Sequence, residues 1–255
     1  MLEYPPRLPE IADPQIAVRQ LIFESEWEEF PYGMHGSGFL ALFGEMLFLV
    51  TAAHCVQEGQ QNTLRVPIRA GDAQVMTFAK FMTFLIPGEE SRDLDIAVLS
   101  IKPGSWIDNH DLREAAIPIP QIFSLESIVR EVEAKGLGVE SIVLRAVGFP
   151  RNAQESRIDL GVGRIVSQPM EVVFRYTRPS VVTNRHIGAI ASSPLADLDG
   201  MSGSPVVLRT TRPDEATKRY VFVGMLVRAS SSVVEFVSGE LIRDALQRAV
   251  VALRS

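Results

Sequence analysis

The sequence contains a single cysteine, Cys55, so no disulfide can form within the chain. A chain without bridges suits a reducing compartment, and its first residues lack the basic start and apolar core of a secretory signal. We therefore expect a cytoplasmic protein. Cys55 directly follows His54, and an imidazole can activate a thiolate nucleophile. Adjacent residues point apart, however, which favours a small buried filler at Cys55.

Long apolar runs and basic runs are also missing. No stretch reaches the roughly 18 uninterrupted apolar residues that a membrane-spanning helix needs, so we expect no membrane contact. The net charge is −6 and both signs are spread along the chain, which disfavours nucleic acid as a partner. No histidine, cysteine or acidic cluster has metal-ligand spacing, and no glycine-rich phosphate loop is found. We expect neither a metal nor another cofactor.

What the chain does contain is a serine framed by glycines. Residues 200–205 are Gly-Met-Ser-Gly-Ser-Pro, which suits a tight turn with an exposed hydroxyl and N–H groups on one side. Acyl transfer needs this geometry, because a nucleophile attacks while nearby donors stabilise the oxyanion. Gly/Ser-rich turns are common in β proteins, so the hexapeptide alone does not establish catalysis.

Two further segments strengthen the hydrolytic interpretation. Residues 48–56 begin as an apolar, strand-like run that leads through small residues to His54. Residues 93–99 place acids at the start of another buried strand, where a carboxylate needs hydrogen-bond donors. The imidazole of His54 can be that donor, as in a Ser-His-Asp triad. Asp93 and Asp95 both fit by spacing, because residues two apart on a strand face the same side.

With these segments in the order His, Asp, Ser, the chain resembles the trypsin/chymotrypsin-like serine peptidases, in a form familiar from bacterial members. Three motifs carry the resemblance: Thr-Ala-Ala-His-Cys at 51–55, Asp-Ile-Ala-Val-Leu at 95–99 and Gly-Met-Ser-Gly-Ser-Pro at 200–205. Weaker similarities at 36–40, 147–150 and 223–227 extend it over roughly residues 15–250.

The resemblance implies a serine endopeptidase that works through an acyl-enzyme intermediate. Ser202 would attack the scissile carbonyl, His54 would carry the serine proton to the leaving amine, and Asp95 would orient the imidazole. The family pattern selects Asp95 over Asp93, and the position between two glycines selects Ser202 over Ser204.

Other positions follow from the same resemblance. The backbone N–H groups of Gly200 and Ser202 would form the oxyanion hole. Met201 stands where animal digestive members carry an aspartate that pairs with a new N-terminus after zymogen cleavage, so that activation switch is absent. In many secreted members the cysteine after the histidine is disulfide-bonded, and the matching partner position here is Gly36.

Substrate preference is less well defined by the sequence. Ala196, six residues before the nucleophile, matches the base of the specificity pocket, so a preference for Lys or Arg is not supported. Arg228 and Ala229, next to the cleft strand, are also candidate substrate-binding residues. Arg228 either favours an acidic substrate residue or is an ordinary surface arginine. Three other residues that either shape the pocket or do not contribute to it are Asp197, Asp199 and His186.

Short apolar segments separated by turn signals predict an all-β protein. Strands are expected at 15–23, 37–51, 64–69, 73–86, 95–101, 142–148, 158–167, 171–176, 187–191, 205–209, 220–227 and 233–237. The resemblance implies that they form two packed antiparallel barrels of the chymotrypsin type. Apolar residues at spacings of three and four predict a short helix over 125–135 and a closing helix over 240–253.

We expect four parts along the chain. They are an extended arm (1–14), an N-terminal barrel with His54 and Asp95 (15–120), an inter-barrel helix and C-terminal barrel with Ser202 (121–238), and a C-terminal helix (239–255). Residues 103–120 are expected to form the linker that crosses between the barrels. The helix over 125–135 is an addition to the family pattern, and it either packs against the junction or contacts a regulatory protein partner.

The sequence leaves three functions to distinguish. The leading one is a serine endopeptidase that acts on a peptide or protein substrate. A serine esterase on the same fold would use the same three side chains. A catalytically latent pseudoprotease would bind peptides without cutting them, and its usual signature, a missing triad member, is not found in this sequence.

Overall fold

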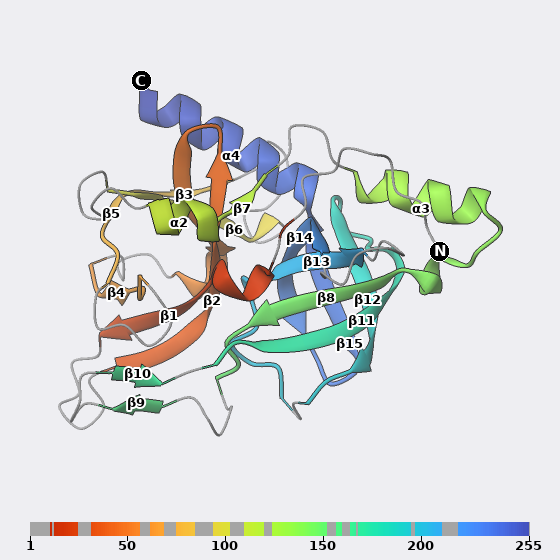
Figure 1. Cartoon of the computed structure of the whole chain (residues 1–255), viewed down its shortest axis with the longest axis horizontal. Helices are drawn as coiled ribbons and strands as arrows, with labels where there is room; N and C mark the ends of the chain where they lie inside the picture. Colours follow the sequence, from red (N-terminus) through yellow and green to blue (C-terminus); the bar gives the residue numbers. More distant parts are fainter. Residues whose placement is uncertain are drawn as a thin grey trace.

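The computed structural model consists of two β assemblies packed side by side, with a long C-terminal helix that extends from the second assembly along the first (Figure 1). The prediction of a mainly β protein with a C-terminal helix is confirmed. The structure describes residues 11, 13–24, 32–56, 62–68, 75–84, 94–102, 110–119, 124–151, 157–159, 164–166, 168–194, 197–210 and 219–254.

The N-terminal assembly is a mainly antiparallel sheet. Its strands follow the order β4-β1-β2-β3-β6-β5, and β7 pairs in parallel with β2. The two edges meet at one isolated bridge, between Pro67 and Val75. The described part is thus a half-barrel sheet whose edges are joined at this one point, in partial agreement with the expected barrel. The bounds are β1 (Val18–Glu24), β2 (Tyr32–Phe43), β3 (Met46–Ala52), β4 (Leu64–Arg65), β5 (Phe78–Thr83), β6 (Ile96–Ile101) and β7 (Ile117–Pro118).

The C-terminal assembly is a closed barrel, as predicted. Six strands follow the order β11-β12-β15-β14-β13-β8, and β8 closes the barrel by pairing with both β11 and β13. The bounds are β8 (Val143–Gly148), β11 (Met170–Pro179), β12 (Arg185–Ser192), β13 (Pro205–Thr210), β14 (Arg219–Ala229) and β15 (Val233–Ser238). A separate two-stranded ribbon is formed by β9 (Arg157–Asp159) and β10 (Arg164–Val166).

The segment expected to be a linker, 103–120, contains regular structure in its described part. Helix α2 (His110–Ala115) is followed by β7, in which Ile117 pairs with Ala41 of β2. Leu112 and Ile117 are almost fully buried, so this segment contributes to the N-terminal core instead of only crossing the surface. The nearby prolines favoured a linker, but burial of these apolar side chains determines the outcome.

Part of the expected N-terminal arm is attached to the C-terminal barrel. The N–H of Ile11 donates to the carbonyl of Tyr220 at 2.7 Å, and the Tyr220 N–H donates back to Ile11 at 3.0 Å. Ile11 is also buried. This residue is therefore held in place by a pair of backbone hydrogen bonds as well as by apolar contact.

Both predicted helices are present. Helix α3 (Leu125–Ala134) begins at Ser124, whose hydroxyl accepts the N–H of Ser127, and is followed by Gly136 at a φ of 70°. Its apolar face packs into the core of the C-terminal barrel through Leu125, Ile128 and Val132. Helix α4 (Gly239–Arg254) packs through Ile242, Ala245, Leu246 and Ala249 into a different cluster, which contains the N-terminal core, and it lies against both β14 and β6.

The two assemblies share one hydrophobic core where they meet. Residues of β13, β14 and β15 belong to the same buried cluster as the N-terminal sheet. Phe39 of β2 and Phe222 of β14 lie with their ring centroids 5.4 Å apart. Burial of this apolar surface fixes the position of each assembly relative to the other, so side chains from both can meet in one site.

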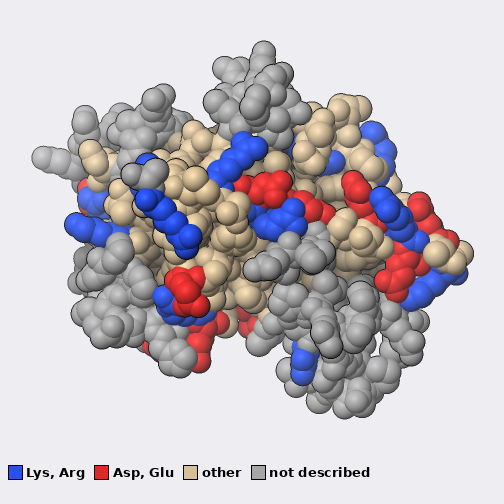
Figure 2. Space-filling model, turned by 90° about the horizontal axis from the view of Figure 1, so that it is seen from above, with Lys and Arg blue, Asp and Glu red and all other residues tan. Residues whose placement is uncertain are grey.

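Charged side chains of both signs are mixed on the face shown in Figure 2. Figure 2, which views the molecule from the side of α3 and α4, shows acidic and basic residues interspersed instead of gathered into one patch. Among the described residues, no helix has both the length and the apolar composition needed to cross a membrane.

Packing of α4 gives a first prediction. Leu246 is fully buried, so Leu246→Ala should lower the free energy of unfolding by about 3 kcal/mol in denaturant titrations. Val251 lies on the same helix but is 60% exposed, so Val251→Ala should change the free energy of unfolding by less than about 0.5 kcal/mol. Equal effects of the two substitutions would contradict the described packing of α4.

Candidate active site

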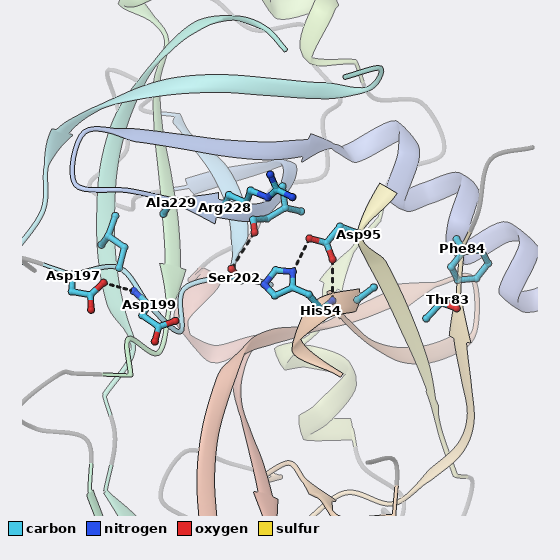
Figure 3. A pocket seen from close by; sticks show the side chains of 12 residues that line it. His54, Thr83, Phe84, Asp95, Asp197, Asp199, Ser202, Arg228 and Ala229 are labelled. Atoms are coloured by element: carbon cyan, nitrogen blue, oxygen red, sulfur yellow. Dashed lines mark hydrogen bonds and ion pairs between the residues drawn. The ribbon is translucent and has the colours of Figure 1, made fainter. Parts of the chain in front are cut away.

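Side chains from both assemblies line a pocket of about 690 Å³ (Figure 3). The N-terminal sheet and the turn after β3 contribute Ala53, His54, Thr83, Phe84 and Asp95, and the C-terminal barrel contributes Asp197, Leu198, Asp199, Ser202, Val227, Arg228 and Ala229. The three residues predicted to be catalytic, His54, Asp95 and Ser202, therefore surround the same pocket.

His54 lies on a single 3-10 turn (Ala53–Cys55) directly after β3, and Asp95 immediately precedes β6. Three hydrogen bonds join the two segments. The carboxylate of Asp95 accepts two hydrogen bonds from His54, one at Oδ2 from the ring Nδ1 (2.7 Å) and one at Oδ1 from the backbone N–H (2.9 Å). The backbone carbonyl of Asp95 accepts the third, from the N–H of Ala53 (3.0 Å). A neutral ring that donates from Nδ1 leaves Nε2 free to accept a proton.

Asp95 has a backbone conformation that is uncommon for a residue with a side chain. Its φ is 52°, in the left-handed region, and it is buried. The hydrogen bonds to the His54 turn stabilise this conformation, and they also satisfy a carboxylate that burial alone would disfavour. The carboxylate of Asp95 is therefore buried beside the imidazole of His54 by a residue whose backbone conformation is strained.

The imidazole of His54 is electrostatically perturbed. Its hydrogen bond to Asp95 raises the pKa of His54 above the ordinary 6.5, and the contact with Cys55 acts in the same direction. The ring is half-exposed on the pocket side, whereas Asp95 is almost completely buried. A raised pKa makes His54 a stronger base, but one that loses its proton only at higher pH.

Ser202 lies in a turn that depends on two glycines with positive φ. Gly200 and Gly203 have φ values of 89° and 87°, which residues with side chains rarely adopt. A Cβ on Gly203 would lie 1.9 Å from the carbonyl oxygen of Ser37, so the turn also needs the missing side chain in order to approach β2. The prediction of a tight turn around Ser202 is confirmed.

Ser37 of β2 holds this turn against the N-terminal sheet, a role that the sequence did not indicate. Its N–H donates to the carbonyl of Ser202 (2.9 Å), and its hydroxyl donates to the carbonyl of Gly200 (2.8 Å). The same hydroxyl accepts the N–H of Phe149 (2.8 Å), and the Ser37 carbonyl accepts the Thr51 hydroxyl (2.7 Å). The three bonds of the Ser37 hydroxyl and carbonyl are buried, and together with the backbone bond to Ser202 they fix the Ser202 turn against the N-terminal sheet.

The carbonyls around Gly200 are oriented by specific partners. The carbonyl of Asp199 accepts the N–H of Arg151 (2.7 Å), and that of Met201 accepts the N–H of Ser204 (3.1 Å). In a trans peptide the C=O and the next N–H point in opposite directions, so the N–H groups of Gly200 and Ser202 point away from these partners. Neither N–H has a hydrogen-bond partner among the described residues, and both remain candidate oxyanion donors.

The hydroxyl of Ser202 donates to the carbonyl of Val227 at 3.1 Å, and no hydrogen bond joins it to His54 (Figure 3). The structure thus brings Ser202 and His54 to the same pocket without a direct contact between the predicted nucleophile and the predicted base. Rotation about one side-chain bond redirects a serine hydroxyl, since staggered rotamers of such a small side chain are readily exchanged.

The competing residues differ in their surroundings. Ser204 is fully buried, and its hydroxyl has no hydrogen-bond partner among the described residues, so it is not presented to the pocket. Cys55 is buried with its Sγ 3.7 Å from the Ser202 carbonyl, and Gly36 lies directly opposite it. Asp93 lies outside the described residues.

Four of the six predicted specificity residues line the pocket. Arg228 and Ala229 line the pocket, as do Asp197 and Asp199, whereas Ala196 lies outside the described residues. The side chain of Asp197 accepts the N–H of Asp199 (3.0 Å), and Asp199 forms an exposed ion pair with Arg151 (3.3 Å).

His186 is placed away from the pocket. It is buried in the C-terminal barrel next to Phe236, and its Nδ1 lies 3.4 Å from the hydroxyl oxygen of Tyr176. Desolvation lowers the pKa of His186 to about 4, so the ring is neutral at pH 7. A structural role in the barrel core follows from these surroundings.

The described residues contain no group of three or more His, Cys, Asp or Glu side chains placed to bind a metal ion. A comparison with protein-family models finds none that matches the chain, and no curated protein matches it closely enough to count as a relative. The functional interpretation therefore depends on the geometry of the site itself.

Removal of the Asp95 charge should be visible at His54. In Asp95→Asn the pKa of His54 should fall, because the hydrogen bond to a carboxylate that raises it is lost. Titration of the His54 ring by NMR, assigned with a His54→Gln variant, measures this shift. Asp199→Asn removes the same charge from the same pocket without touching His54 and should leave its pKa nearly unchanged. A His54 pKa that Asp95→Asn does not lower would contradict the described hydrogen bond.

Burial of His186 should make the protein sensitive to acid. The unfolded chain binds a proton at His186 below pH 6.5 and the folded one only near pH 4, so stability falls as the pH drops from 6.5 to 4. The loss attributable to His186 should reach about 3 kcal/mol. Other acids titrate in this window, so the test is the difference in unfolding free energy between the natural protein and His186→Gln at each pH. A difference that does not change with pH would contradict the neutral, buried state.

Proposed function

We propose that this chain is a serine endopeptidase in which Ser202 is the nucleophile. The observation that carries the proposal is the short hydrogen bond between His54 Nδ1 and Asp95 Oδ2 in a pocket that Ser202 also lines. An imidazole oriented by a buried carboxylate beside a serine on a glycine-framed turn is the arrangement that acyl transfer requires. The likeness of the two β assemblies to the trypsin/chymotrypsin type is part of the same proposal.

The steps follow from the positions of these groups. Ser202 Oγ bonds to the scissile carbonyl carbon while its proton passes to His54 Nε2. The imidazolium, stabilised by Asp95, returns the proton to the leaving amine as the C–N bond breaks, which leaves an acyl-enzyme. A water molecule then attacks the ester with His54 again as the base, and the acid product and free Ser202 are released.

Negative charge on the carbonyl oxygen needs donors during both steps. The N–H groups of Gly200 and Ser202 are assigned this role, and the loss of one such donor typically raises the barrier by about 3–4 kcal/mol. The carbonyl of Val227, which accepts the Ser202 hydroxyl in this structure, belongs to a residue that lines the same pocket, and it can accept an N–H from a peptide substrate once the hydroxyl turns away. A peptide offers that donor, which supports a peptidase over an esterase.

The position of the Ser202 hydroxyl favours a second candidate, a latent peptide-binding protein. The hydroxyl donates to Val227 instead of His54, so the nucleophile is not activated in this conformation. A substrate N–H that takes over the Val227 carbonyl would release the hydroxyl toward His54. In a latent protein this rotation would not follow binding, and turnover would be absent.

Turnover measurements on serine variants test the proposal. Ser202→Ala should reduce kcat/KM on a peptide library by several orders of magnitude, because the nucleophile is lost, while the fold is kept. Ser204→Ala is the matched control, since that hydroxyl is buried without a described partner and removal should leave turnover within about twofold. The hydrogen bond to Asp95 raises the pKa of His54 to about 10, so turnover by the natural protein should also rise with pH toward that value, as His54 loses its proton.

Residual activity of Ser202→Ala equal to that of the natural protein would overturn the assignment of Ser202. Absence of peptide cleavage together with peptide binding would favour the latent alternative. Cleavage of simple esters but of no peptide would favour a serine esterase.

A further inference from the structure

Arg228 introduces a positive charge into the wall of the pocket. It follows Val227 on β14, one residue after the carbonyl that accepts the Ser202 hydroxyl, and its side chain is exposed. Of the described lining residues, the cationic side chains are Arg228 and, when protonated, His54. In Figure 3 Arg228 lies beside Ser202, on the side away from Asp197 and Asp199.

The guanidinium of Arg228 has no hydrogen-bond or ion-pair partner among the described residues. Its neighbour in register on the adjacent strand is Glu235 of β15, but that carboxylate is already bound. The carboxylate of Glu235 accepts a hydrogen bond from the buried Arg185 guanidinium at Oε2 (3.2 Å) and one from the Ser180 hydroxyl at Oε1 (3.0 Å). The nearest acid in the sheet is therefore held by other residues.

The three acidic residues that line the pocket also have partners within the protein. Asp95 is bound to His54, and Asp199 forms the ion pair with Arg151. Asp197 accepts the backbone N–H of Asp199. Arg228 is thus a lining cation without a partner among the described residues, and a carboxylate that enters the pocket beside it is attracted, whereas Asp197 and Asp199 lie in another part of the pocket.

We propose that Arg228 selects substrates with an Asp or Glu side chain close to the scissile bond. This inference rests on the proposed function, because it assigns a substrate class to the same pocket. A guanidinium presents paired N–H donors that match a carboxylate, and it is always charged. Because the carboxylates of Asp197 and Asp199 lie in another part of the pocket, the preference is restricted to the substrate position that lies beside Arg228, so the selectivity is positional and not a general affinity for negative charge.

The test compares peptide sets that differ only in Glu, Gln or Lys at one position at a time around the cleaved bond. The natural protein should show a kcat/KM three- to tenfold higher for Glu than for Gln at one position, the range for a partly exposed charged hydrogen bond. Arg228→Gln should remove this preference, and Arg228→Glu should reverse it in favour of Lys. The preference should also shrink as salt is raised, because the group is exposed.

A matched control separates a local contact from a change in net charge. Arg130→Glu makes the same charge change on the exposed surface of α3, where Arg130 pairs only weakly with Glu126 (3.6 Å), and should leave the Glu preference unchanged. If the natural protein has no Glu preference at any position, or keeps it in Arg228→Gln, the inference is overturned.

Binding to Ser202→Ala separates this inference from the proposed function. Fluorescence anisotropy with the same peptides measures affinity without cleavage. Arg228-dependent binding of Glu peptides without turnover by the natural protein would support acid recognition and contradict the peptidase. Cleavage without any effect of Arg228 would support the peptidase and contradict acid recognition. If the peptides are neither bound nor cleaved, both are contradicted.

Discussion

The contact of Ser37 with the turn at residues 200–203 is the constraint on which the proposed site depends. Ser37 belongs to the N-terminal sheet, yet it binds the carbonyls of Gly200 and Ser202 and the N–H of Phe149, all from the C-terminal half. These bonds are directional, whereas the shared apolar core that surrounds the junction is not. The core brings the assemblies together, and Ser37 sets the orientation of the turn that carries Ser202.

The division of the site between the two halves has a consequence for function. His54 and Asp95 are fixed to each other by hydrogen bonds within the N-terminal half, independently of Ser202. To complete the proposed triad, the Ser202 hydroxyl would have to turn toward His54. In this structure the hydroxyl donates a hydrogen bond to the carbonyl of Val227 instead. A peptide that occupies the Val227 carbonyl would change that balance, so substrate binding and alignment of the nucleophile are linked in our account.

Much of the site could be predicted from the sequence because its chemistry depends on local motifs. The turn around Ser202 needs glycines at 200 and 203, and their positive φ values require that residue type. The hydrogen bond of His54 to Asp95 followed from the need to satisfy a buried carboxylate. The role of Ser37, the direction of the Ser202 hydroxyl and the location of His186 in the barrel core could not be predicted, because each depends on contacts between segments distant in sequence. The same holds for α2 and β7, where the burial of Leu112 and Ile117 outweighed the local proline signals.

Labelling with a fluorophosphonate probe, followed by intact mass spectrometry and peptide mapping, tests the central claim most directly. The probe reacts with a serine only where base and oxyanion donors are assembled around it. Our account predicts one adduct per chain, located at Ser202 and formed faster as the pH rises toward the raised pKa of His54, about 10. An adduct at another residue, or none at any pH between 6 and 10, would contradict the assignment of Ser202 as the nucleophile of a hydrolase.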